Sequence, residues 1–98
     1  MTDDKPWYLK GSNIARELEN FKSASKEKTS LDTKTKELIK FAVSSVFRCT
    51  HCTDSHMKKA LAAGATKEEV TEALLLSSVQ AAATQMNWNK EAFEKYLG

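Results

Sequence analysis

Residues 49–56, CTHCTDSH, bring thiol and imidazole side chains close together along the chain. Cys49 and Cys52 are three positions apart, and His56 follows Cys52 by four positions. On an α-helix, positions i, i+3 and i+7 lie on one stripe, so these three side chains share a face if a helix begins at or just after Cys49. The spacing alone is compatible with a metal clamp, a disulfide or a redox centre.

A cysteine pair at the start of a helix has two chemical advantages. Its sulfurs are close enough to bridge, and the partial positive charge of a helix N-terminus stabilises a thiolate, which lowers a thiol pKa from about 8.5. His56, one turn after Cys52, is placed to take the thiol proton or to hold the thiolate as an ion pair. His51 projects from nearly the opposite side of a helix, and only irregular geometry at the turn would bring it round.

A histidine base normally needs an orienting partner, and Glu37 is the candidate. It precedes Cys49 by twelve residues, which is ~18 Å along a straight helix and too far for contact. If the helix after the motif folds back antiparallel, His56 lies ~10 Å from the turn, and two long side chains can close much of the gap. This geometry allows a relay from Glu37 through His56 to Cys52. The alternative is that Glu37 is a solvated acid in the first turn of its helix.

The elements that must position these side chains are helices. Gly is scarce, Pro6 is the single proline, and Ala, Lys, Glu and Leu are abundant, which favours an all-α fold of about five helices. Each expected helix has a start or stop signal. The five span Ser12 to about Lys28, Asp32 to the cysteine motif, about Thr50 to Gly64, Thr66 (capping box with Glu69) through SSVQAAAT, and a short segment after Asn87.

The second of these helices is expected to form the centre of the core. Its apolar residues repeat as adjacent pairs every four residues, which is typical of a well-buried helix face. They are Leu38, Ile39, Ala42, Val43, Val46 and Phe47.

Length and composition exclude several classes of protein. The 98 residues suit one domain, which we expect to span residues 1–98. The net charge is only +2, with both signs interspersed, so a nucleic acid is not an expected partner. The start is acidic and then mixed, and no apolar run approaches the ~18 residues of a membrane span, so we expect a cytoplasmic protein that does not bind a membrane. Two cysteines this close together cannot link distant segments.

Residues 37–74, ELIKFAVSSVFRCTHCTDSHMKKALAAGATKEEVTEAL, resemble the alkylhydroperoxidase D-like branch of the carboxymuconolactone decarboxylase superfamily. The likeness consists of a Glu, a twelve-residue step to a CxxC, a following His, and the continuation AGAT-EE-EAL. It implies an all-helical fold and reduction of peroxides by the cysteine pair. Members that act as lactone decarboxylases typically lack that pair, so its presence here argues against their chemistry.

The resemblance also implies a role for each site residue. Cys52 is the thiolate that attacks the peroxide, Cys49 is the resolving thiol, and Glu37, His51 and His56 form the proton relay. An external dithiol or redox protein restores the two thiols, and no bound cofactor is required. The predicted enzyme is therefore a thiol peroxidase that reduces hydroperoxides.

Other interpretations of the motif stay open. A CxxC with a nearby His could hold zinc, but structural zinc sites usually take four ligands from two separated pairs, and the chain has no second pair. The cysteines could also be inert buried residues. Two further alternatives are a disulfide reductase that acts on a partner protein and a non-catalytic oligomeric module that senses redox state or holds a metal.

The chain is also expected to form a homo-oligomer. It contains one copy of the helical unit, where some family members carry two, and it has more apolar surface than one small core should hold. Trp7, Tyr8, Trp88 and Phe93 near its ends add to this surface. We expect pairs related by a two-fold axis, and the resemblance suggests further association into a hexamer. The CxxC helices should lie near subunit interfaces without being bridged across them.

Overall fold

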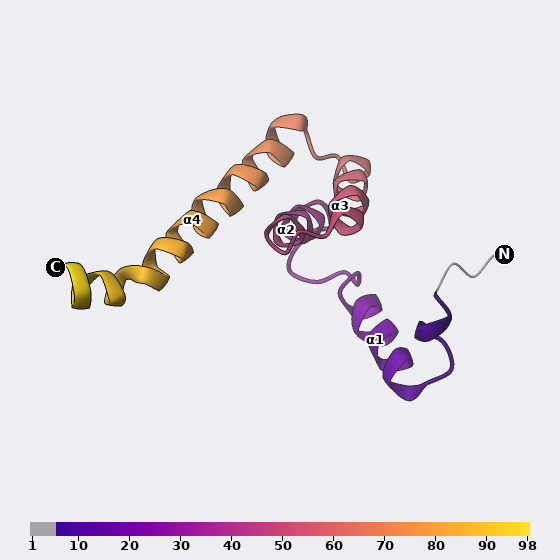
Figure 1. The fold of residues 1–98 in the computed structure, drawn as a ribbon. Helices are drawn as coiled ribbons and strands as arrows, with labels where there is room; N and C mark the ends of the chain where they lie inside the picture. Colours follow the sequence, from indigo (N-terminus) through magenta and orange to yellow (C-terminus); the bar gives the residue numbers. More distant parts are fainter. Residues whose placement is uncertain (1–5) are drawn as a thin grey trace. The chain divides into compact units, whose positions relative to one another are not determined.

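The computed structural model describes residues 6–98, which are all-helical, with no strand in that range (Figure 1). A short 3-10 helix, η1 (Trp7–Leu9), precedes four α-helices: α1 (Asn13–Ala24), α2 (Thr33–Val46), α3 (Thr50–Ala62) and α4 (Lys67–Leu97). The all-α prediction is confirmed. Residues 1–5, which include the acidic start of the sequence, lie outside the described range.

Contacts divide the chain into two compact units, one up to Ser30 and one from Leu31 to Gly98. The first contains η1 and α1. As predicted, Ser12 caps α1, because its hydroxyl accepts a hydrogen bond from the Ala15 N–H at 3.1 Å. The helix ends at Ala24, before the predicted Lys28. Its expected apolar stripe of Ile14, Leu18 and Phe21 is exposed.

The second unit holds α2, α3 and α4 around a small core. Asp32 caps α2, since its carboxylate accepts from the Thr35 N–H at 2.7 Å. The prediction that α2 forms the centre of the core is correct for only one face of that helix. Ile39, Val43 and Val46 are each 48% exposed. The core is formed by Phe41, Ala60, Ala65 and Val70, with Leu38 and Ala73 packed against it.

The two turns of this unit share one geometry. After α2, the N–H of Cys49 donates to the Ser44 carbonyl at 3.1 Å and the N–H of Arg48 donates to Ser45 at 3.3 Å. This is the Schellman pattern, whose turn residue takes a left-handed conformation. Arg48 has a φ of +60° there, at a position that Gly usually fills. The turn after α3 repeats the pattern with Gly64 at a φ of +98°.

The prediction of a separate helix after Asn87 is wrong, because α4 continues without a break from Lys67 to Leu97. The segment contains neither Gly nor Pro, and Asn within a helix costs only a few tenths of a kcal/mol more than the better helix formers. Asn89 instead bonds within the helix, donating to the Gln85 carbonyl at 2.9 Å. No helix among the described residues has the length and apolar character needed to cross a membrane.

The predicted capping box at the start of α4 is confirmed, and it is tied to α2. One carboxylate oxygen of Glu69 accepts from the Thr66 N–H, and the other accepts from the Lys34 ammonium, both at 2.9 Å. The bond to Lys34 is the main cause of a lowered pKa for Glu69, and the same bond raises the pKa of Lys34. Glu69 thus stabilises its own helix end and holds it against the start of α2.

Candidate functional site

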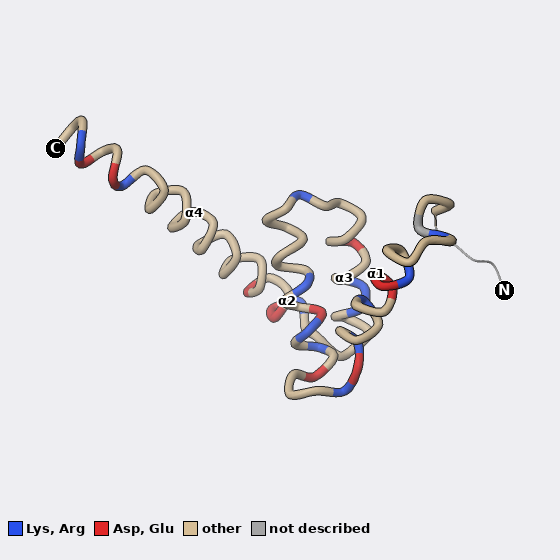
Figure 2. The backbone as a smooth tube through the Cα atoms, turned by 90° about the horizontal axis from the view of Figure 1, so that it is seen from below, with Lys and Arg blue, Asp and Glu red and all other residues tan. Residues whose placement is uncertain are grey.

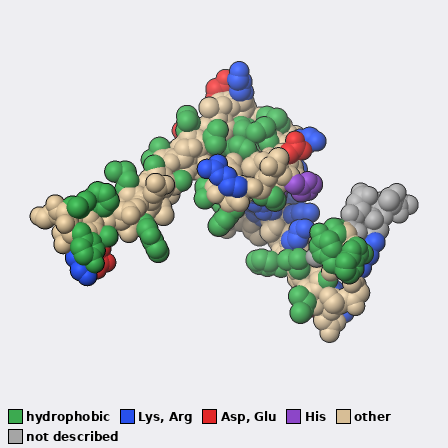
Figure 3. Space-filling view, in the orientation of Figure 1, with side chains coloured by type: hydrophobic (Ala, Val, Ile, Leu, Met, Phe, Trp, Pro, Cys, Tyr) green, Lys and Arg blue, Asp and Glu red, His purple; other side chains and the backbone are tan. Residues whose placement is uncertain are grey.

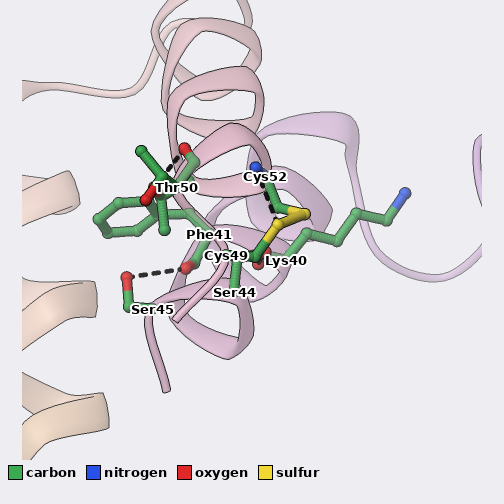
Figure 4. The surroundings of a disulfide bond; sticks show 8 residues. Lys40, Phe41, Ser44, Ser45, Cys49, Thr50 and Cys52 are labelled. Carbon is green, nitrogen blue, oxygen red and sulfur yellow. Dashed lines mark hydrogen bonds between the residues drawn. A yellow bond between two sulfur atoms is a disulfide. The ribbon is translucent and has the colours of Figure 1, made fainter. Parts of the chain in front are cut away.

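The two cysteines lie where α2 ends and α3 begins. Cys49 completes the turn after α2 through its N–H and is also the N-cap of α3, where its sulfur accepts the Cys52 N–H at 3.2 Å. The two sulfurs form a disulfide with an S–S distance of 2.02 Å (Figure 4). Both residues are half-buried, so the bond is accessible from one side. A disulfide at a helix N-terminus leaves, on reduction, thiols in an environment that favours thiolate.

The acid and the base of the predicted relay are in direct contact. α3 folds back on α2, so that His56 Nδ1 lies 2.6 Å from Glu37 Oε2. Glu37 is 6% exposed and is the buried charged residue of the described chain. The imidazole Nδ1–H donates to the carboxylate, which fixes the tautomer and leaves Nε2 as the ring nitrogen able to exchange a proton with substrate or thiol.

The solvated interpretation of Glu37 is therefore wrong. Glu37 and Cys49 stay far apart along α2, but α3 folds back along that helix and brings His56 beside Glu37, as the spacing argument required. His56 and Cys52 are both on α3 and one turn apart, so their side chains lie on one face of that helix. The structure pairs Glu37 with His56 and Cys49 with Cys52, and one turn of α3 separates Cys52 from His56.

His51 does not join this group. It is exposed in the first turn of α3, and its side chain makes no hydrogen bond or ion pair with another described residue. Its place in the relay stays a prediction.

Two further residues shape the site, and sequence reasoning missed both. Ser44 supplies the carbonyl that holds the Cys49 N–H, and Arg48 takes the left-handed conformation that turns the chain into the motif. The sequence SSVFRC contains no Gly or Asn to signal such a turn. In Figure 4, Lys40 lies on the same side of α2 as the disulfide, and Ser45 points the other way, donating to the Phe41 carbonyl at 3.1 Å.

The arrangement offers little to a metal. Among residues 6–98, no three His, Cys, Asp or Glu side chains gather in a way that could hold an ion. His56 uses Nδ1 on Glu37, and the two sulfurs are bonded to each other. What the residues can do together is thiol–disulfide chemistry with a proton donor and acceptor one helical turn away.

Comparison with known proteins identifies the family. Residues 13–95 match the carboxymuconolactone decarboxylase family, and the chain belongs to it. The match includes both helices of the hairpin and almost all of α4.

Two relatives extend this result. A crystal structure of a protein from Methanobacterium thermoautotrophicum is 34% identical, with a TM-score of 0.75, covering 82% of this chain and 90% of that one. "Uncharacterized protein 4 in cox locus" of Paracoccus denitrificans is 39% identical over 61 residues, which are 61% of this chain. The match spans 55% of that relative's length. Neither description names an activity.

Proposed function

We propose that the chain is a thiol-dependent peroxidase that reduces hydroperoxides with its cysteine pair. One observation carries the proposal: a half-buried disulfide at the start of α3 lies one helical turn from an imidazole that a buried carboxylate orients at 2.6 Å. A structural disulfide needs no oriented base beside it. Burying a carboxylate costs free energy unless it is paired. The Glu37–His56 pair would therefore be a costly arrangement if it had no chemical task.

In the first step of the proposed cycle, His56 takes the proton of the Cys52 thiol. The thiolate attacks one oxygen of the hydroperoxide, the O–O bond breaks, and the departing alkoxide receives the proton from imidazolium. The products are a Cys52 sulfenic acid and an alcohol. Sulfur has been oxidised by two electrons and the peroxide reduced by two.

In the second step, the Cys49 sulfur attacks the Cys52 sulfenic sulfur. The S–O bond breaks, the disulfide seen in the structure forms, and water leaves with the Cys49 proton. An external dithiol, free or on a redox protein, then reduces the disulfide and is itself oxidised. The sum is one hydroperoxide and one dithiol converted to alcohol, water and one donor disulfide. The cycle requires no bound cofactor.

The test is a single-turnover experiment on reduced protein. One equivalent of hydroperoxide should remove both thiols of each chain and lower the monomer mass by two hydrogens, with no covalent dimer, as mass spectrometry would show. Two thiols that survive excess peroxide would refute the proposal. Oxidation by a protein disulfide but not by peroxide would leave a disulfide reductase as the function.

A further inference from the structure

The hairpin of α2 and α3, which carries the redox centre, is rich in positive charge. Residues 33–62 contain six Lys or Arg residues and two acids, Glu37 and Asp54, for a net charge of +4. Both acids are engaged within the hairpin, since Glu37 is buried against His56 and Asp54 lies 3.3 Å from the Lys58 ammonium. The whole chain has a net charge of only +2. Positive charge is therefore concentrated on the hairpin and is not spread evenly over the molecule.

The neighbouring helix does not share this charge. No residue of α4 from Ala73 to Asn89 is charged, and Figure 2 shows this part of α4 as an unbroken uncharged stretch. Hydrophobic side chains project along the same part of the helix in Figure 3. An anionic reactant is therefore attracted to the hairpin and not to the middle of α4.

Lys40 is the cation that the fold places beside the disulfide. It lies one turn before Ser44 on α2, and the Ser44 hydroxyl donates to its carbonyl at 2.7 Å. The carbonyl of Ser44 in turn holds the Cys49 N–H. In Figure 4, Lys40 is on the same side of α2 as the disulfide, and its ammonium group is directed away from the helix. A flexible stem of this length lets the charge move near a reactant that approaches the sulfurs.

Two further cations continue from Lys40 along the hairpin. Lys36 is one turn earlier on the same stripe of α2, and Lys59 follows His56 by three positions on α3. The acid that lies between these two stripes is Glu37, which is buried and bonded to His56. A reactant at the disulfide thus meets cations from both helices of the hairpin.

We propose that Lys40 is a specificity residue, which selects a reducing dithiol that carries an anionic group beside its thiols. The inference rests on the proposed function for the step that restores the thiols. One thiolate of the donor attacks one cysteine sulfur, the S–S bond breaks, and the other cysteine leaves as a thiolate. The second donor thiol then displaces the first cysteine from the mixed disulfide. The donor loses two hydrogens and becomes a disulfide, and the protein gains them as two thiols.

The charge of Lys40 acts on the reactant in two ways. It attracts any attacking thiolate, and it attracts a second negative group on the donor, which a neutral donor lacks and a cationic donor replaces with repulsion. At a solvated surface, one unit of charge at such a distance changes the rate on the order of threefold. The rates of donors that differ only in charge therefore report the field at the disulfide.

The test is reduction of the oxidised full chain by three small thiols, followed by acid quenching and mass spectrometry. The probes are 2-mercaptoethanesulfonate, which is anionic, 2-mercaptoethanol, which is neutral, and cysteamine, which is cationic. With rates expressed per thiolate, Lys40→Gln should lower the ratio of the anionic to the cationic rate about tenfold, because these probes differ by two charges. Lys40→Arg should keep the wild-type ratio. A purely structural role, or a changed pKa of the cysteines, would alter all three rates by one factor and leave the ratio unchanged.

Lys90→Gln is the matched control, because it removes the same charge from α4 beyond the uncharged stretch. It should leave the ratio at the wild-type value. Lys40→Glu should lower the ratio by about a further tenfold. At about 1 M salt, where the screening length is ~3 Å, the wild-type ratio should fall to that of Lys40→Gln.

Peptide dithiols distinguish a free donor from one carried on a protein. Two synthetic CxxC peptides, one flanked by glutamates and one by lysines, replace the small thiols in the same assay. A preference for the acidic peptide that Lys40→Gln removes would support the proposal with a redox protein as the donor. A preference confined to the small thiols would support it with a small anionic dithiol as the donor.

Three results would overturn the proposal. They are an unchanged ratio in Lys40→Gln, an equal change in Lys90→Gln, and no preference for negative charge in either set of probes. The assay contains no peroxide. It can therefore fail where single-turnover oxidation by peroxide succeeds, and succeed where that oxidation fails, so the two proposals are tested separately.

Discussion

Removing the charge of Glu37 is the sharpest perturbation of the proposed relay. The Glu37→Gln side chain keeps its size and can still accept a hydrogen bond from His56 Nδ1, which lies 2.6 Å from the carboxylate. What it loses is the negative charge that stabilises the imidazolium formed when Cys52 is deprotonated. The variant therefore separates the electrostatic role of Glu37 from its role in packing.

The expected magnitude follows from the burial of the pair. A hydrogen bond to a charged group contributes about 1.5–3 kcal/mol, against about 1 kcal/mol for a neutral one, so Glu37→Gln should cost on the order of 1 kcal/mol. At 1.36 kcal/mol for each factor of ten, that is about a fivefold slower reaction of the thiols. His56→Phe removes the base itself, and acid–base catalysis typically supplies at least about a hundredfold.

The assay is the rate of alkylation and of peroxide oxidation of the reduced protein between pH 5 and 9. Both variants should shift the alkylation profile to higher pH. The double variant should be no slower than His56→Phe alone, because Glu37 acts only through the ring. Effects that add fully, or single variants with the wild-type pH profile, would refute the relay and make the Glu37–His56 pair a purely structural contact.

Three further predictions concern the thiols, the turn and the contact between α2 and α4. Cys52→Ser should abolish peroxidase turnover, whereas Cys49→Ser should leave a sulfenic acid that dimedone traps; the reverse pattern would exchange the two roles. Arg48→Gly should raise the free energy of unfolding by about 1 kcal/mol in chemical denaturation, because Gly adopts a φ of +60° without the penalty of a side chain. An unchanged or lower stability would mean that the Arg48 side chain makes compensating interactions. The lowered pKa of Glu69 predicts a contribution to stability that is present above its ordinary value of 4.5 and is lost as the pH falls below that value, while the raised pKa of Lys34 predicts a loss of stability only above pH 10.5. The melting temperatures of wild type and Glu69→Gln should therefore converge toward pH 3. A difference that stays constant with pH would contradict this.

Much of the local structure could be predicted from the sequence because it depends on neighbouring residues. Ser12, Asp32 and Thr66 cap their helices as expected, since a cap needs only its own side chain and an N–H two or three residues later. The contact between Glu37 and His56 could be predicted for a related reason. Once a short turn follows Cys49, helix geometry fixes which turns of α2 and α3 face each other.

The errors fell where the outcome depends on more distant contacts. Asn87 resembles a helix cap, yet α4 continues through it, because Asn is tolerated inside a helix and only the surrounding structure decides between the two roles. The burial expected for Ile39, Val43 and Val46 rested on their spacing alone. Spacing identifies an apolar face, but it does not say which molecule covers that face.

The three roles of Cys49 restrict which insertions and deletions the chain can accept. Its N–H closes the end of α2, its sulfur caps α3, and the same sulfur is half of the disulfide. An inserted or deleted residue between Val46 and Thr50 would separate these roles, although loops of this kind usually tolerate changes in length. Reduction, by contrast, leaves the helix cap available, because a thiolate accepts the Cys52 N–H at least as well as a disulfide sulfur does. The hairpin can therefore pass between its oxidised and reduced forms without either helix having to unwind.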